Sequence, residues 1–164
     1  MGIEIERKFL VESDDWRSHV ERSVHMRQGY FRTGPESTVR VRLVDPLGES
    51  ATSEAHGVLT IKGAPSNGIR PEFEYTIPPE DVEQMLDLFC GDRIVSKVRH
   101  YVEHAEHTWV VDDFEGENAG LVMAEIELDA PDETFDTPGW VATDVSDDPS
   151  YTNAELARRP VSER

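Results

Sequence analysis

Charged side chains recur at every second position in most strand-like segments of this chain, and this spacing limits the folds that it can adopt. In the first segment, residues 3–11 (IEIERKFLV), the charged Glu4, Glu6 and Lys8 are two residues apart. Successive side chains of a β-strand point to opposite faces, so these three charges share one face of a strand. For a single strand, the simpler interpretation is a half-buried strand whose charged face lies in water.

The same spacing returns along the rest of the chain. Further strand-like segments, separated by turn residues, lie at 26–33, 38–45, 58–63, 70–77, 93–102, 108–115 and 121–129. Charges two residues apart occur in the pairs Arg40 and Arg42, Glu72 and Glu74, Lys97 and Arg99, and Glu125 and Glu127. Two other segments carry the single charges Lys62 and Asp112. Such regular alternation is not expected of scattered surface charges.

Helical segments accompany these strands. Helices are predicted at 13–23, 79–90 and 153–159, and an acidic, proline-containing loop at 130–150. Thr152 and Glu155 form a capping box for the last helix. We therefore predict a single domain over residues 1–164 that is mainly β (α+β). Its predicted architecture is an eight-stranded antiparallel closed barrel with a few flanking helices.

The charged faces have two alternative directions in such a barrel. They lie outside, around an apolar core, or inside, where they line a wet tunnel. The segments concentrate cations although the whole chain has a net charge of -18. These faces carry the cations Lys8, Arg40, Arg42, Lys62, Lys97 and Arg99 and the carboxylates Glu4, Glu6, Glu72, Glu74, Asp112, Glu125 and Glu127. This mixture of signs favours the tunnel, with the apolar faces packed under helices.

The composition excludes several classes of partner. A net charge of -18 and a pI near 4.6 argue against nucleic acid, because phosphate binding needs clustered Lys and Arg. No apolar run approaches the roughly 20 residues of a membrane-spanning helix.

The lack of a signal-peptide pattern and the single cysteine, Cys90, predict a cytoplasmic protein. We expect Cys90 to be a small buried hydrophobe.

Seven motifs of the chain, taken in order, resemble a known family. The motifs are EIERK, VRVRL, LTIKG, EFEYTI, VSKVRHY, WVVDDFEG and AEIEL, and a YTNAELA ending follows them. Together they resemble the CYTH domain of the triphosphate tunnel metalloenzymes, from Ile3 to about Arg159. The first motif is weak by itself, whereas the ordered set is specific. The family fold is an eight-stranded antiparallel tunnel.

The resemblance implies an enzyme that cleaves phosphoanhydride bonds. Family members include inorganic triphosphatases, thiamine triphosphatases and class IV adenylate cyclases. A triphosphate is a long polyanion, for which Arg supplies forked contacts and Lys supplies point charges. Oxygen-ligated Mg²⁺ or Mn²⁺ activates water and stabilises the leaving oxygen. We predict a metal-dependent triphosphatase that acts on inorganic triphosphate or a small organic triphosphate.

The resemblance also implies a role for each charged residue of the strands. Phosphates are bound by Lys8, Arg40, Arg42, Lys62, Lys97 and Arg99. Metal is held by Glu4, Glu6, Glu125 and Glu127, while Asp112, Glu72 and Glu74 are further ligands or balancing charges. The candidate catalytic residues are Lys97 and Tyr30, because Tyr30 matches a tyrosine of small bacterial members and could pair with Lys97.

Two alternative functions stay open. A class IV adenylate cyclase makes cyclic AMP from ATP and needs an adenine pocket, which no motif identifies. A module that binds polyphosphate or nucleotide without turnover would have lost a metal ligand, and none of the four glutamates is lost.

The sequence also leaves open whether the protein forms a homodimer and which metal it prefers. A phosphate contact from the last helix is open too, because Pro149 and Ser150 stand where the family often has a basic residue.

Overall fold

The chain folds into one antiparallel sheet, which we analyse in a computed structural model that describes residues 5–34, 36–48, 53–64 and 71–164. The strands in these ranges are β1 (Ile5–Val11), β2 (Val20–Tyr30), β3 (Ser37–Leu47), β4 (His56–Gly63), β5 (Glu72–Ile77), β6 (Ile94–His104), β7 (His107–Phe114), β8 (Val122–Leu128) and β9 (Val141–Asp144). Their order across the sheet is β5-β4-β3-β2-β6-β7-β8-β1-β9. Among the described residues, β5 and β9 stand at the two ends of this order and do not pair with each other.

Two α-helices and several single turns complete the described structure. The helices are α1 (Pro79–Met85), which continues into the π-helical η2 (Leu86–Cys90), and α2 (Asn153–Arg158). Short 3₁₀ turns are η1 (Asp15–His19), η3 (Gly116–Asn118), η4 (Pro149–Tyr151) and η5 (Val161–Glu163). The helices predicted at 79–90 and 153–159 are confirmed, and the Thr152 hydroxyl caps α2 by accepting a hydrogen bond from the Glu155 backbone N–H. None of the described helices has the length and apolar character needed to cross a membrane.

The helix predicted at 13–23 and the number of strands were wrong. Residues 15–19 form only the turn η1, and β2 begins at Val20 because it pairs with both β3 and β6. This pairing outweighs the local helix-start signal.

The predicted eight strands are nine, because β9 lies within the predicted loop 130–150 and pairs with β1. Four residues are too few for the alternation of a strand to be recognised.

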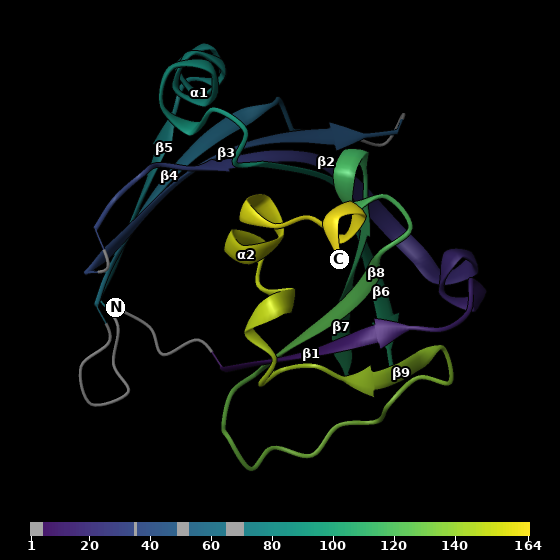
Figure 1. Cartoon of the computed structure of the whole chain (residues 1–164). Coiled ribbons are helices and arrows are strands. Elements are labelled where there is room, and N and C mark those ends of the chain that lie inside the picture. The colour runs from purple at the N-terminus through teal and green to yellow at the C-terminus, as the bar shows by residue number, and fades with distance from the viewer. Residues whose placement is uncertain (1–4, 35, 49–52, 65–70) are drawn as a thin grey trace.

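The sheet is strongly curved and therefore has an inner and an outer face. Figure 1 shows α2 on the inner side, surrounded by strands, and α1 on the outer side of β3 and β4. Leu156 and Ala157 of α2 belong to a core cluster with Val95, Phe114 and Met123, which lie on β6, β7 and β8. The helix α2 thus covers part of the inner face, beside the charged side chains.

The apolar side chains opposite the charges form the outer face, as predicted. Val41 packs with Val82 and Leu86 under α1 and η2. Elsewhere on the outer face, over β1, β7 and β8, Phe9, Trp109 and their neighbours pack against Trp16 of η1 and Trp140, which precedes β9. The charges at alternate positions consequently face inward.

The edge strand β5 is an exception to this packing. Phe73 and Tyr75, which we expected to be covered, are 57% and 54% exposed. The helix α1 packs over β3 and β4 and leaves the outer face of β5 largely open.

Candidate active site

A buried ion cluster joins β6 and β7 on the inner face. Lys97 and Arg99 lie on β6 and both reach Asp112 of β7. Lys97 Nζ donates a hydrogen bond to Asp112 Oδ2 at 2.5 Å, and Arg99 Nε and Nη2 donate to the two carboxylate oxygens at 2.8 Å. The side chains of Lys97 and Asp112 are 0% and 1% exposed. Both oxygens of Asp112 are therefore occupied by cations of the protein.

Burial and charge oppose each other in this cluster. Burial favours a neutral Asp112, but Arg99 and Lys97 hold the pKa of its carboxyl well below the usual range. Burial lowers the pKa of Lys97 to about 8, because the carboxylate that opposes this effect is shared with Arg99. Burial also acts against the charge of Arg99, yet Asp112 and Glu125 raise its pKa above the ordinary value. At neutral pH, the buried Lys97 and the largely buried Arg99 thus share Asp112.

Lys97 has a second partner on α2. Its Nζ donates to Asn153 Oδ1 at 3.0 Å, and the Phe114 ring centroid lies 5.2 Å away. The last helix therefore reaches the charged cluster through a neutral amide rather than through a basic side chain.

The cluster extends from Arg99 to the carboxylates of β1 and β8. Arg99 Nη2 donates to Glu125 Oε2 at 3.2 Å, and Lys8 Nζ lies 4.0 Å from Glu125 Oε1. Lys8 also pairs with Glu6 on its own strand. In the register of the two strands, Lys8 lies opposite Glu125 and Glu6 lies opposite Glu127.

The carboxylates of β1 and β8 fit a hard divalent cation. Like charges directly opposite each other on paired strands repel, and a cation between Glu6 and Glu127 would remove this repulsion. Carboxylate oxygens are the ligands that Mg²⁺ and Mn²⁺ prefer. Among the described residues, no three His, Cys, Asp or Glu side chains form a metal-binding group by themselves. The predicted ligand Glu4 lies outside the described residues.

A second basic group lies on β3, and its centre is Arg42. Arg42 Nε donates to Gln28 Oε1 of β2 at 2.8 Å, and Gln28 Nε2 donates to Tyr30 Oη at 2.8 Å. Burial lowers the pKa of Arg42 to about 10, and the nearby charges of Arg40 and Arg99 act in the same direction. Arg42 is still charged at neutral pH, and no carboxylate within the described ranges forms an ion pair with it.

Arg40 has only part of its guanidinium satisfied. Its Nη2 donates to Thr60 Oγ1 at 2.9 Å and lies 3.8 Å from Glu74 Oε2. Its Nε is buried and has no hydrogen-bond partner in the part of the chain that the structure describes. A buried donor without a partner costs about 1–3 kcal/mol, so Arg40 is suited to an incoming acceptor. Further along β4 and β5, Lys62 Nζ lies 3.2 Å from Glu72 Oε2.

The expected pairing of Tyr30 with Lys97 is absent. Lys97 donates to Asp112 and Asn153, whereas the Tyr30 hydroxyl accepts from Gln28. Burial raises the pKa of Tyr30 even though Arg40 and Arg42 oppose this shift. Tyr30 is therefore a neutral phenol at physiological pH.

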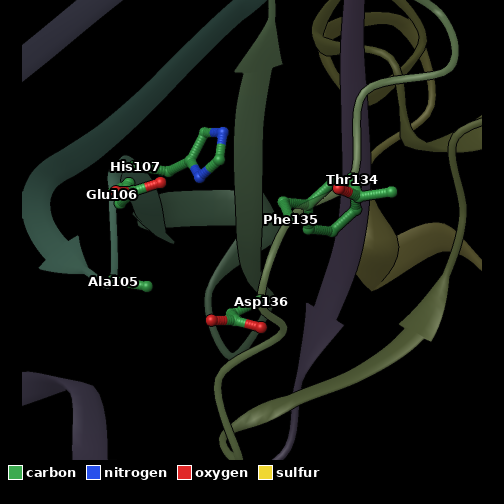
Figure 2. A pocket seen from close by; sticks show the side chains of 6 residues that line it. All are labelled: Ala105, Glu106, His107, Thr134, Phe135 and Asp136. Atoms are coloured by element: carbon green, nitrogen blue, oxygen red, sulfur yellow. The ribbon is translucent and has the colours of Figure 1, made fainter.

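A cavity opens at the acidic end of the cluster. Its volume is about 430 Å³, and its lining includes Glu6, Arg99, Tyr101, Glu125 and Glu127. A smaller hollow of about 270 Å³ lies beside it, between the β6–β7 turn and residues 134–136 (Figure 2). The two hollows share Glu106 and His107. The described acidic side chains are thus accessible from solvent through the larger cavity.

Comparison with known proteins identifies the family. A profile of the CYTH domain matches residues 2–158. The chain belongs to the CYTH domain family. This CYTH domain is 38% identical over 160 residues to the inorganic triphosphatase of Acetivibrio thermocellus, covering 98% of this chain and 96% of that protein. It is 31% identical over 158 residues to the inorganic triphosphatase of Nitrosomonas europaea, covering 94% and 96%.

A solved structure resembles the CYTH domain along almost its whole length. The crystal structure of an inorganic triphosphatase matches with a TM-score of 0.68 and 28% identity, covering 96% of this chain and 95% of that one. The family resemblance recognised in the seven sequence motifs is thereby confirmed.

Three residues of the candidate site were missed in the sequence. Gln28, Thr60 and Asn153 are neutral and carry no signal in a search for alternating charges. Gln28 does share strand parity with Tyr30, and Thr60 with Lys62, so the period of two could have found them. Asn153 lies in the YTNAELA ending, where only the fold brings it to Lys97.

Proposed function

We propose that this protein is a metal-dependent triphosphatase that hydrolyses inorganic triphosphate. The observation that carries the proposal is the positive charge of Arg42, beside the guanidinium of Arg40, whose hydrogen-bonding groups are only partly satisfied. Within the described residues, Arg42 lacks a carboxylate partner and Arg40 Nε lacks any acceptor. A bound polyanion would supply both. The two relatives, both inorganic triphosphatases, support this substrate.

The charged residues divide the inner face into two functional parts. The basic part, Lys8, Arg40, Arg42, Lys62, Lys97 and Arg99, binds phosphoryl oxygens. The acidic part, Glu6, Glu125 and Glu127, would hold Mg²⁺ or Mn²⁺, and the sequence motif assigns the same role to Glu4, which lies outside the described residues. When bound, the cation polarises phosphoryl oxygens and makes a bound water more acidic. Closure of the curved sheet into a tunnel would exclude water and strengthen each of these charge interactions.

Three further carboxylates, Asp112, Glu72 and Glu74, have a different role. Asp112 accepts three hydrogen bonds from Lys97 and Arg99, which leaves its oxygens unsuited to metal ligation. We assign Asp112 to holding these two cations in place. Glu72 and Glu74, which are more exposed, partly balance the charges of Lys62 and Arg40.

Lys97 and Tyr30 act on the phosphoryl groups from the side covered by α2. Negative charge moves onto the leaving oxygen only as the phosphoanhydride bond breaks, so a nearby cation stabilises the transition state more than the bound substrate. This is the role of Lys97. Tyr30, as a neutral phenol, donates a hydrogen bond to a phosphoryl oxygen.

Phosphate release from a panel of substrates tests the proposal. The panel is tripolyphosphate, thiamine triphosphate, ATP and long-chain polyphosphate, each with Mg²⁺ and with Mn²⁺. We expect tripolyphosphate to be hydrolysed fastest, and only when a divalent cation is present. Formation of cyclic AMP from ATP would instead identify an adenylate cyclase. Binding without phosphate release would identify a non-catalytic module, and either result overturns the proposal.

A further inference from the structure

Gln28 is a buried polar residue at the centre of the basic group, and none of the charged motifs includes it. Its side chain is 0% exposed, and Gln28 lies directly opposite Arg42 in the pairing of β2 with β3. The carboxamide makes two hydrogen bonds of 2.8 Å, accepting from Arg42 Nε and donating to Tyr30 Oη. One neutral group therefore joins the cation and the phenol.

These two bonds determine the orientation of all three side chains. A flipped amide would turn its NH₂ group toward the guanidinium, which has only donors, so Arg42 selects the observed orientation. Because Arg42 Nε is occupied by Gln28, the two terminal nitrogens remain for a forked contact. Tyr30 Oη accepts from Gln28, and the neighbouring Arg40 and Arg42 cannot accept its hydrogen. The phenolic hydrogen is thus left for an acceptor in the site.

We propose that Gln28 is a positioning residue that directs the Arg42 fork and the Tyr30 hydroxyl onto the same phosphoryl group of the substrate. This inference rests on the proposed function for the identity of the substrate. Its chemical requirement is a neutral side chain with both an acceptor and a donor at position 28.

A carboxylate at this position would defeat the arrangement. Asp112 pairs with Arg99 through two hydrogen bonds of 2.8 Å, and a carboxylate opposite Arg42 would pair with it in the same manner. The positive charge offered to the substrate would then be neutralised within the protein. The lowered pKa of Arg42, against the raised pKa of Arg99, agrees with this difference in partners.

Two measurements test the proposal. Calorimetry without divalent cation gives the affinity for tripolyphosphate, and steady-state kinetics at saturating Mg²⁺ give KM and kcat. We expect Gln28→Met, which keeps length but has no hydrogen-bonding amide, to weaken binding about tenfold, because a hydrogen bond to a charged group is lost. Gln28→Glu should weaken it more. Both should raise KM more than they lower kcat. Gln84→Met on α1, which changes an exposed glutamine on the outer face, should match the wild type.

A second background separates positioning from general structural support. In a background with Arg42→Lys and Tyr30→Phe, which keeps the charge but removes the fork and the phenolic hydroxyl, Gln28→Met should change tripolyphosphate affinity by less than about twofold. An equal loss in both backgrounds would show that Gln28 acts through stability alone and would overturn the proposal, as would wild-type affinity in Gln28→Met. Thermal unfolding of each variant checks that it is folded. If Gln28→Met does not fold, Gln28→Glu, which can pair with Arg42, takes its place as the test variant.

The two proposals fail in distinguishable ways. If the wild type binds tripolyphosphate but releases no phosphate, the triphosphatase proposal fails while the affinities still test Gln28. If the wild type does hydrolyse tripolyphosphate and Gln28→Met has an unchanged Kd and KM, only the positioning role fails. Absence of tripolyphosphate binding to the wild type, both without and with divalent cation, overturns both.

Discussion

At the scale of single residues, Asp112 is the carboxylate that two buried cations share. Asp112→Asn would leave Lys97 and Arg99 with little compensation, and breaking a buried ion pair typically costs about 3–5 kcal/mol. We expect a loss of unfolding free energy of this size at pH 7, measured by urea denaturation. Asp113→Asn is the matched control, because the neighbouring Asp113 pairs with the part-exposed Arg17 on the opposite face.

The pH dependence of this loss has a definite sign. The pKa of Asp112 is lower in the folded state than the unfolded value of about 3.9, so its contribution is fully present above that value. The contribution is lost progressively as the pH falls toward the folded pKa. The stability difference between the wild type and Asp112→Asn should therefore narrow below about pH 4. A difference that stays constant down to pH 2 would contradict the assignment.

Arg42 and Lys97 should differ in their kinetic effects. Arg42 clamps a phosphoryl group whose charge is similar in the ground and transition states, so Arg42→Ala should raise KM for tripolyphosphate more than it lowers kcat. Lys97→Met should mainly lower kcat, because the cation acts on charge that develops as the bond breaks. Steady-state kinetics at saturating Mg²⁺ compare the two. A pure KM effect in Lys97→Met would mean that this lysine only binds substrate.

At the scale of elements, the contact of β2 with η2 depends on the absence of a side chain at Gly29. A Cβ built on Gly29 would lie 2.6 Å from Cys90 Sγ and 2.7 Å from Leu86 Cδ2, closer than packed atoms allow. Gly29→Ala should destabilise the fold by about 1–3 kcal/mol through overpacking. Gly34→Ala is the control, because nothing lies within 4 Å of its Cβ.

Thermal unfolding measures this effect on packing. Adding Cys90→Ala to Gly29→Ala should recover part of the loss, since the closest atom, Sγ, is then removed. No recovery would indicate that Leu86 Cδ2 and the Cβ at position 90, rather than Cys90 Sγ, oppose the new Cβ.

At the scale of the whole molecule, the acidic end of the inner face should make turnover depend on a divalent cation. Glu6→Gln replaces a carboxylate ligand with an amide of similar shape, which binds Mg²⁺ or Mn²⁺ more weakly. We expect Mn²⁺ affinity and divalent-dependent turnover to fall by about 100-fold, with the melting temperature unchanged. Electron paramagnetic resonance of bound Mn²⁺ gives the affinity independently of activity. Glu21→Gln, an exposed change on β2, should leave both unchanged, and normal Mn²⁺ binding in Glu6→Gln would remove Glu6 from the metal site.

The sequence by itself determined which residues of each strand share a face and to which family the chain belongs. Side chains of equal parity in a strand share one face, so Arg40 could be grouped with Arg42, and Lys97 with Arg99, before any fold was known. The ordered motifs were sufficient for the CYTH family because each lies on a different strand of the same sheet.

Only the tertiary structure decided which of these charges meet. Strand register decides which side chains pair across neighbouring strands, such as Asp112 with Lys97 and Arg99, and Gln28 with Arg42. The alternation of charges along one strand does not specify this register. The reach of Asn153 to Lys97 depends on α2 lying inside the curved sheet, a contact between residues 56 positions apart. The physical reason is that parity is a local property of the backbone, whereas register, curvature and helix docking depend on the packing of the whole domain.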